Sequence, residues 1–352
     1  MTDTARTSPV TLHDVAREAG VSLATASRSL NGSTRNVKAA NRERVLEAAE
    51  RLGYSANASA QAVARGTTTT VALLVGDIAD PYFSSIAAGV VGAAEDHHLV
   101  VTMAETRRDT AREVEMVRAL RGQRPRAIIL AASRRLGDPH AAALAEELAK
   151  YEAGGGRVVF ISTVDAPFRM LHVDNAGGAQ ALGSELAAMG YREVAILAGP
   201  GDGAEVMPLR TSEDRLTGFR EGLASHGVDV PASRVISTAF TRDGGYEGMQ
   251  QLIGTFGSDL GGIDLVFAVN DVMAVGAMSA ARDAGLVPGR DVAVAGFDDI
   301  PTLRDVTPRL TTASLPLERV GEEALALALA EEPGSPALLE AEVAIRESTP
   351  GR

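Results

Sequence analysis

Residues 22–31 carry side chains that could contact a negatively charged polymer at close range. Between the ends of this range, Thr25, Ser27, Arg28 and Ser29 can each donate a hydrogen bond. On the outer face of one helix, such small donors could approach the phosphates and base edges of DNA. Arg28 matches the two acceptors of guanine. An ordinary helical hairpin is the alternative for so short a segment, so its flanking residues matter.

The preceding residues predict a helix–turn–helix. Thr11 and Asp14 have the spacing of a capping box at the start of a helix. Apolar residues then recur at positions i, i+3, i+4 and i+7: Leu12, Val15, Ala16 and Ala19. Gly20 permits the left-handed backbone of a sharp turn, and Ser22 can cap a second helix over 23–30. In a DNA-binding motif of this kind, the second helix lies in the major groove.

A third helix is predicted from about 39 to 52. Its expected apolar face comprises Val45, Leu46, Ala49 and Leu52. Residues 57–65 are rich in alanine and have helical propensity, but a helix of this length is unstable alone in water. Residues 1–66 hold nine basic and six acidic residues, whereas the remaining residues hold 25 basic and 40 acidic ones. A basic head on an acidic body favours a DNA-binding head with a separate sensing body.

The composition predicts a soluble, folded protein of two or three domains. The 352 residues are 45% hydrophobic and 23% charged, with a net charge of −12 and no cysteine. The sequence contains no apolar run long enough to span a membrane, and residues 1–10 lack the apolar segment of a secretory signal. We therefore expect a cytoplasmic protein without disulfides.

From residue 71 onward, short apolar runs alternate with amphipathic stretches. The runs 71–77, 99–105 and 127–132 are typical of strands buried on both faces. A second series of the same kind follows residues 172–175. Alternation of strand and helix predicts parallel sheets covered by helices, and two series predict two α/β subdomains.

Ligands of such folds bind at the carboxyl ends of the strands. The residues at these ends include aromatic, acidic, amide and arginine side chains: 80–83, Ser162, Arg215, Phe240, 270–271 and 298–299. Aromatic rings could stack on a polyol or ring ligand while the polar groups bind its hydroxyls. For any single residue, a role as a turn or cap residue is the alternative.

No motif in the sequence predicts catalysis. There is no phosphate-binding loop and no dinucleotide fingerprint, and no metal-ligand spacing among the six histidines. We expect neither a cofactor nor a metal, and we expect the protein not to be an enzyme.

Nearly the whole chain resembles the lactose/galactose-repressor (LacI/GalR) family of bacterial transcription regulators. The segments that carry the resemblance are VTLHDVAREAGVSLATASRSLNG, RERVLEAAERLGYSAN, DPYFSSIAAGV, HVDNAGG, GYREVAILAG, DRLTGFREGL, VNDVMAVGAM, VAVAGFDDI and the terminal RESTP. The resemblance implies a small all-α helix–turn–helix head plus a hinge helix. These would join an α/β periplasmic-binding-protein-like body of two doubly wound parallel-sheet subdomains.

The resemblance also implies which residues bind DNA. Leu23, Ala24 and Arg28 occupy the positions that read base edges. Phosphate contacts are implied for Ser22, Thr25, Ser27 and Asn31. In the hinge, Ala60 and Val63 occupy the positions that press into the minor groove, where Leu is usual at position 63. Lys38 replaces the usual Ser or Thr cap of the third helix.

In the body, the resemblance implies a site for a small effector, such as a sugar or sugar derivative. The implied contact residues are Tyr82, Phe83, Thr211, Arg215, Phe240, Asn270 and Asp298, together with Ser162. Ser162 stands where many sugar-responsive members have Asp, which removes one ionic acceptor.

We therefore expect a DNA-binding transcription regulator, a repressor, whose operator affinity responds to the effector. The expected parts are a head (1–56), a hinge helix (57–66) and a body (67–352). Within the body, the subdomains are expected over about 67–170 plus 314–340 and about 171–313 plus 341–352. Its expected partners are near-palindromic double-stranded DNA and a second copy of the chain, and no membrane. A free-standing solute-binding protein and an enzyme on the same body fold are the alternatives.

Overall fold

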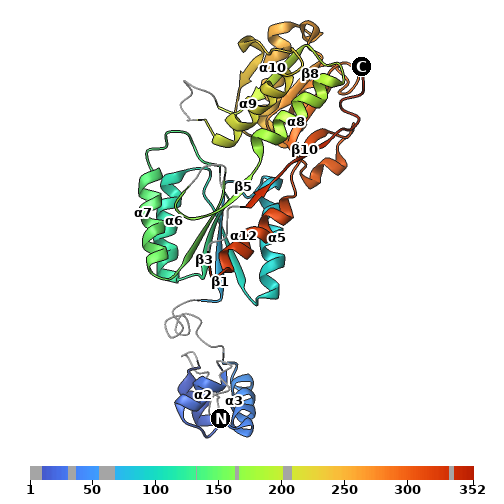
Figure 1. Ribbon diagram of the computed structural model, residues 1–352. Helices are drawn as coiled ribbons and strands as arrows, with labels where there is room; N and C mark the ends of the chain where they lie inside the picture. Colours follow the sequence, from blue (N-terminus) through green and yellow to red (C-terminus); the bar gives the residue numbers. More distant parts are fainter. Residues whose placement is uncertain are drawn as a thin grey trace. The chain divides into compact units, whose positions relative to one another are not determined.

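The structure is a computed structural model of the 352-residue chain. It describes residues 10–30, 37–54, 68–131, 133–162, 166–200, 208–332 and 337–352. The chain divides into two compact units, Met1–Thr68 and Thr69–Arg352. Figure 1 draws the first unit as a small helical body and the second as an α/β body.

The first unit contains the predicted helix–turn–helix and third helix. Its helices are α1 (Leu12–Glu18), α2 (Leu23–Leu30) and α3 (Ala39–Arg51). Their small core consists of Val15, Ala16, Ala19, Ala26, Val45, Ala48 and Ala49. The prediction that Leu46 is buried was wrong, because its side chain is 47% exposed and Ala48 is buried instead. Positions 45, 48, 49 and 52 share one face of the helix, whereas position 46 lies to the side of that face.

The predicted caps of the first two helices are confirmed. The Thr11 and Asp14 side chains each bond to the other residue's backbone N–H, forming a capping box. The Thr25 N–H donates to Ser22 Oγ at 3.1 Å. Lys38 precedes α3 without a side-chain cap, as the sequence indicates.

The first sheet of the larger unit is fully parallel, with strand order β11-β5-β4-β3-β1-β2. Its strands are β1 (Thr70–Val75), β2 (Val100–Glu105), β3 (Ala127–Ala131), β4 (Arg157–Ile161), β5 (Arg169–Val173) and β11 (Ala337–Leu339). Its helices are α5 (Pro81–Asp96), α6 (Thr110–Gln123), α7 (Ala141–Ala153) and α12 (Leu317–Leu329). One core forms under α6 and α7, and the opposite face of the sheet packs against α5 and α12 (Figure 1).

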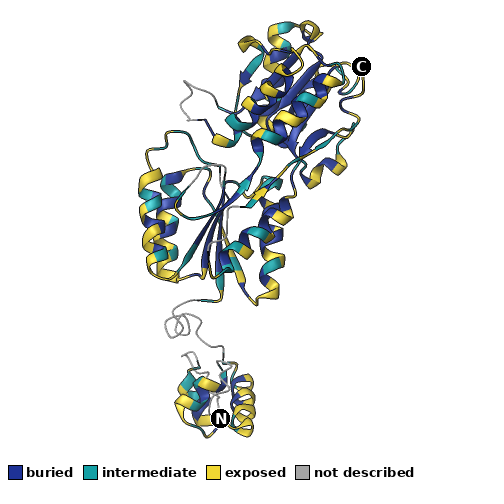
Figure 2. Ribbon diagram, viewed as in Figure 1, coloured by how far each residue is buried: buried dark blue, intermediate teal, exposed yellow. Residues whose placement is uncertain are grey.

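The second sheet has the order β12-β10-β9-β8-β6-β7 and is parallel except for β12, which is antiparallel to β10. Its strands are β6 (Val194–Ala198), β7 (Val235–Ser237), β8 (Leu265–Ala268), β9 (Ala293–Asp298), β10 (Thr311–Ser314) and β12 (Glu342–Ala344). Its helices are α8 (Asn175–Ala188), α9 (Arg210–Ala224), α10 (Arg242–Phe256) and α11 (Asp271–Asp283). Three single-turn helices, η1–η3, are Ala232–Arg234, Leu260–Gly262 and Pro301–Asp305. Every residue of β6, β8 and β9 is buried, because helices cover both faces (Figure 2).

The chain passes between the two sheets three times. It leaves the first sheet after β5, returns to it through α12 after β10, and crosses again between β11 and β12. Figure 1 shows these connections close together between the two halves of the larger unit. All three chain connections between the halves therefore lie on one side (Figure 1).

Two glycines let α5 and α12 approach each other closely. A Cβ at Gly89 would lie 1.8 Å from the carbonyl oxygen of Glu318, and one at Gly321 would lie 2.1 Å from that of Ile86. Only glycine fits at either position with this helix spacing. Among the described residues, no helix is long and apolar enough to cross a membrane.

Candidate functional site

The first candidate site is the outer surface of α2 in the head. Ser22, Leu23, Ala24 and Arg28 are exposed, whereas Thr25 and Ser27 are half-buried. Ser29 was predicted on this surface, but it is 2% exposed and its Oγ donates to the Thr25 carbonyl at 2.8 Å. Ser29 lies one turn after the buried Ala26, so its hydroxyl bonds to a carbonyl of its own helix. Asn31, Ala60 and Val63 lie outside the described residues.

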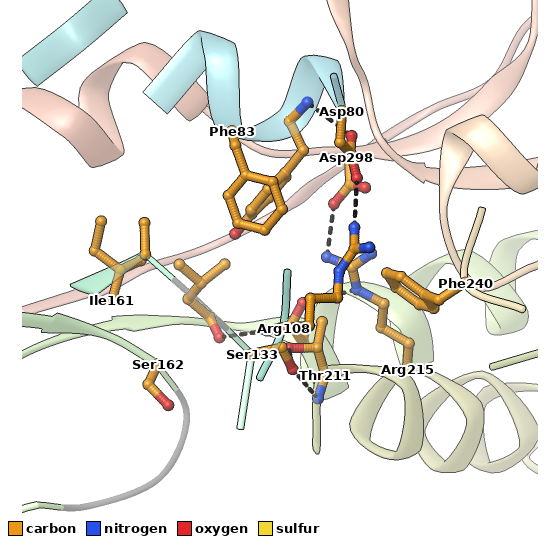
Figure 3. Close-up of a pocket in the computed structure, with 14 residues that line it drawn as sticks. Asp80, Phe83, Arg108, Ser133, Ile161, Ser162, Thr211, Arg215, Phe240 and Asp298 are labelled. Atoms are coloured by element: carbon orange, nitrogen blue, oxygen red, sulfur yellow. Dashed lines mark hydrogen bonds and ion pairs between the residues drawn. The ribbon is translucent and has the colours of Figure 1, made fainter. Parts of the chain in front are cut away.

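The second candidate site is a cleft between the two sheets of the larger unit (Figure 3). Seven of the eight predicted effector residues line it: Tyr82, Phe83, Ser162, Thr211, Arg215, Phe240 and Asp298. Tyr82 and Phe83 begin α5 of the first sheet, and Arg215 and Phe240 belong to the second sheet's layer. The two sheets thus turn the carboxyl ends of their strands toward the same cavity, as expected for this architecture.

Asn270 is the eighth predicted residue, and it is not among those that line the cleft. It is 1% exposed, and its Oδ1 accepts a hydrogen bond from the Met273 N–H at 2.9 Å. The side chain therefore caps α11. Asn270 thus has the capping role that is the alternative to ligand contact for a polar residue at a strand end.

Asp80, one of the strand-end candidates over 80–83, also lines the cleft. Six further residues of the cleft were not predicted: the polar Arg108, Ser133 and Asn175 and the apolar Ala131, Ile161 and Val173. All of them lie at or just after the ends of β1 to β5, or one turn further on. The strand-end rule could have found Ser133 and Asn175, because Ser133 directly follows the apolar run 127–132 and Asn175 lies two residues after the end of β5.

Arg215 holds the base of the cleft together. Its Nη2 donates to Asp298 Oδ1 at 2.6 Å, its Nε to Asn175 Oδ1 at 2.8 Å and its Nη1 to the Val269 carbonyl at 2.9 Å. The guanidinium carbon lies 4.0 Å from the centre of the Phe297 ring. Three hydrogen bonds and a ring contact hold this 1% exposed cation in one orientation.

Two buried carboxyl groups have raised pKa values. Burial raises the pKa of Asp298, although the positive charge of Arg215 opposes the shift. Burial likewise raises the pKa of Asp271 to about 6, against hydrogen bonds from Thr312 Oγ1 at 2.7 Å and the Ile300 N–H at 3.0 Å. Asp298 also has a backbone φ of +119°, which is rare for a residue with a side chain. This unusual backbone lies at the wall of the cleft.

A second arginine lies in the same cleft, on the loop after β2. Arg108 Nη2 donates to Asp80 Oδ2 at 3.2 Å, and its Nη1 is 3.5 Å from Asp77 Oδ2. The guanidinium carbon lies 5.7 Å from the ring centres of both Phe83 and Phe240. Figure 3 shows the Arg108 side chain between these rings. Burial raises the pKa of Asp80, and the charge of Arg108 opposes that shift.

Direct hydrogen bonds also join the two sheets' loops across the cleft. Ser133 Oγ donates to Thr211 Oγ1 at 2.7 Å and accepts from the Thr211 N–H at 3.2 Å. The Leu136 N–H donates to the Pro208 carbonyl at 3.0 Å, and the Arg210 N–H donates to the Arg134 carbonyl at 2.8 Å. These loops therefore hold the two halves in contact on the side opposite the three chain crossings.

The arrangement suits binding of a small polar molecule with an apolar face. Aromatic rings supply flat contact surfaces, and the hydroxyl, amide and charged groups can bind ligand hydroxyls. Among the described residues, no group of His, Asp or Glu side chains is placed to hold a metal ion.

Two family models match the chain. One, described as bacterial regulatory proteins, lacI family, matches residues 11–57. The other, described as periplasmic binding protein-like domain, matches residues 184–349. The first therefore covers the helices of the head, and the second covers most of the second sheet and the return to the first.

Curated relatives and solved structures are similar over nearly the whole length. The transcriptional regulator GalS of Salmonella typhimurium is 31% identical over 325 residues, 91% of this chain and 89% of GalS. The transcriptional repressor CytR of Escherichia coli K12 is 31% identical over 350 residues, 96% of each chain. The structure of the Lac repressor dimer bound to operator and the anti-inducer ONPF has 26% identity and a TM-score of 0.78, covering 97% of this chain and 99% of that one. The CelR–cellobiose complex has 29% identity and a TM-score of 0.67, covering 96% and 99%.

Proposed function

Because the chain belongs to the LacI family of bacterial transcription regulators, we propose that it is a repressor controlled by a small ligand in its cleft. The ligand is a sugar or a sugar-like molecule. It changes the affinity of a homodimer for near-palindromic operator DNA in the cytoplasm. The observation that carries this proposal is the meeting of seven predicted effector residues in one cleft between the two sheets.

The proposed division of labour follows the two compact units. The head (1–56) binds DNA through Ser22, Leu23, Ala24, Thr25, Ser27, Arg28 and Asn31, and the hinge (57–66) through Ala60 and Val63. The exposed surface of α2 supports the first part, because Leu23 and Arg28 are accessible there. The body binds effector and partner subunit. One bound head presents a single arginine on α2, so a dimer with two heads supplies the contacts for tight, specific binding.

The ligand class is supported by the chemistry of the cleft and by relatives. Cellobiose and ribose are named in structures of similar chains, CelR and a LacI-family regulator of Enterococcus faecium. Here Phe240 and Phe83 offer apolar faces, and Ser162, Thr211 and Asp298 offer groups for hydroxyls. The hexose acceptor that Asp supplies at position 162 in many members is absent, because this chain has Ser162.

The test has two stages. The full-length chain is first used to select duplexes from a randomised DNA pool, and binding of the selected sequence is measured over a range of salt concentrations. A thermal-shift screen of sugars, sugar phosphates and nucleosides then identifies a ligand, because a molecule that binds only the folded state raises its stability. We expect that ligand to change the operator Kd by roughly 5- to 150-fold.

A matched variant separates the two sites. Phe240→Leu keeps the apolar volume of the cleft but removes the aromatic face, so operator binding stays and the ligand response weakens. Failure to bind any duplex at any salt concentration would exclude a regulator. It would favour the free-standing solute-binding protein.

A further inference from the structure

The Arg108 guanidinium occupies a small space that the rest of the cleft builds around it. We call this space the cation slot and define it by the rings of Phe83 and Phe240 and the carboxylates of Asp77 and Asp80. Arg108 lies 5.7 Å from each ring centre, 3.2 Å from Asp80 Oδ2 and 3.5 Å from Asp77 Oδ2 (Figure 3). Its side chain is 14% exposed. The two rings come from opposite sheets, so the cation bridges the cleft.

Two glycines make room for the slot. A Cβ at Gly76 would lie 2.9 Å from Phe83 Cζ and 3.1 Å from Arg108 Cγ. A Cβ at Gly199 would lie 2.7 Å from Ser212 Oγ and 3.2 Å from Phe240 Cδ2. A larger residue at position 76 would push the Phe83 ring or the arginine out of place, and one at position 199 would displace Ser212 and crowd the Phe240 ring. The backbone on both sides of the cleft is therefore shaped for this arrangement.

The loop that carries Arg108 has an unfavourable backbone. Arg107 and Arg108 have φ values of +57° and +55°, and two consecutive side-chain-bearing residues in this region are uncommon. The Arg135 Nε donates to the Arg108 carbonyl at 3.1 Å, and the Arg108 N–H donates to Thr106 Oγ1 at 3.3 Å. These two hydrogen bonds, together with the contacts of the Arg108 guanidinium in the slot, hold the loop in a conformation that its backbone alone disfavours. A ligand that replaced the guanidinium would free the loop to relax.

The charges around the slot favour a positive group. The other arginine of the cleft, Arg215, is paired with Asp298, whereas Asp77 and Asp80 both face Arg108. Aromatic faces attract cations through their electron-rich surfaces, and two carboxylates add to that attraction. A carboxylate or phosphate would be repelled by the same groups. The slot is therefore suited to a positively charged group and not to an anion.

We propose that the cation slot is a subsite of the cleft that accepts a protonated amine, amidine or guanidine group of a ligand, and that Arg108 occupies it until such a group takes its place. The role of the cleft in effector binding rests on the proposed function. The affinity of the slot for cations does not. Arg108 is a specificity-determining residue in this scheme, because only ligands able to replace a guanidinium reach the space between the rings.

The experiment uses chemical complementation of the full chain. Arg108→Ala removes the atoms that ethylguanidinium would restore, and N-ethylurea has nearly the same shape without the charge. We expect ethylguanidinium at about 10 mM to raise the Tm of the variant saturably, by about 2 °C or more, and N-ethylurea to have no such effect. Wild type should show a much smaller rise at the same concentration, because its tethered Arg108 competes with ethylguanidinium for the slot. Arg121→Ala, which loses an ion pair with Glu147 outside the cleft, is the matched control.

Two further variants make the result decisive. Arg108→Gly adopts the left-handed backbone without strain, so it tests the slot even if the alanine variant folds poorly. Adding Phe240→Leu to Arg108→Ala removes one ring face and should weaken half-saturation by about 3-fold or more. Equal responses to ethylguanidinium and N-ethylurea, or no response beyond that of Arg121→Ala, would overturn the proposal. The readout requires neither DNA nor effector, so loss of operator binding would refute the proposed function alone.

Discussion

Arg215 and Asp298 form a 2.6 Å ion pair at the base of the cleft, although 83 positions separate them in the sequence. The first belongs to α9 and the second ends β9. Through its other donors, Arg215 also fixes Asn175 at the start of α8 and the carbonyl of Val269 after β8. One side chain thus connects three strand ends of the cleft.

This connection makes Arg215 sensitive to a substitution that keeps its charge. A lysine cannot reproduce the three directed hydrogen bonds of the guanidinium, so we expect Arg215→Lys to lower the free energy of unfolding by about 2–4 kcal/mol. Urea denaturation measures the loss. Arg210→Lys is the control, because Arg210 pairs with Asp214 near the surface of the same helix. It should change stability by no more than about 0.5 kcal/mol. Equal losses in the two variants would contradict the role given to Arg215.

Asp271 predicts a specific dependence of stability on pH. Its pKa in the folded state is raised to about 6, so the folded chain retains a proton that the unfolded chain releases near pH 4. The stability from this group is fully present below about pH 4 and is lost as the pH rises through about 6. We expect Asp271→Asn to reduce the stability difference between pH 4 and pH 7 by roughly 2–3 kcal/mol, measured by urea denaturation. Asp229→Asn, with a side chain 92% exposed, should leave the profile unchanged.

The close approach of α5 and α12 can be tested by adding a methyl group at the glycine between them. Gly89→Ala would place a Cβ 1.8 Å from a backbone oxygen of α12, so we expect a loss of about 2–3 kcal/mol in unfolding free energy. Gly92→Ala lies on the same helix with no atom within 4 Å of the added Cβ. That control should be neutral or stabilising by up to about 1 kcal/mol. A neutral Gly89→Ala would mean that the helices are not held at this spacing.

Arg28 tests the DNA-binding surface of α2. If its exposed guanidinium reads a base, Arg28→Ala should cost about 1–3 kcal/mol on the selected operator and relax the preference at one base pair per half-site. Competition binding with operators substituted at each position measures both effects. Arg51→Ala, at the end of α3 and 63% exposed, serves as the charge-matched control. A uniform loss on every sequence would instead identify Arg28 as a phosphate contact.

The elements with strong periodicity were predictable from the sequence. The apolar runs around β1, β3, β6 and β8 are buried on both faces, and the N-termini of α1 and α2 carry recognisable caps. The strands β10, β11 and β12 were not predicted, because each has three or four residues, and Thr311 and Glu342 interrupt the apolar pattern. Such short segments become strands only through pairing with neighbours.

The same contrast holds for the cleft. Phe240 and Asp298 lie at the ends of apolar runs and Tyr82 lies in the first turn of the helix after β1, and their types already suggest ligand contact. Arg108 was not predicted, because its entry into the cleft depends on two left-handed residues that no sequence pattern indicates. Asn270 was predicted as a contact, but its amide caps α11. Sequence distinguishes cap from contact poorly, since Asn serves both purposes at the same kind of position.

The last chain crossing has a consequence for folding during synthesis. β11 and β12 are adjacent in the sequence, yet one completes the edge of the first sheet and the other completes the edge of the second. Neither sheet can gain its final strand until this shared segment has emerged from the ribosome. The head and the inner strands can form earlier, since N-terminal parts of a nascent chain fold first. Both lobes of the body would then be completed almost simultaneously, as a late and coupled event in translation.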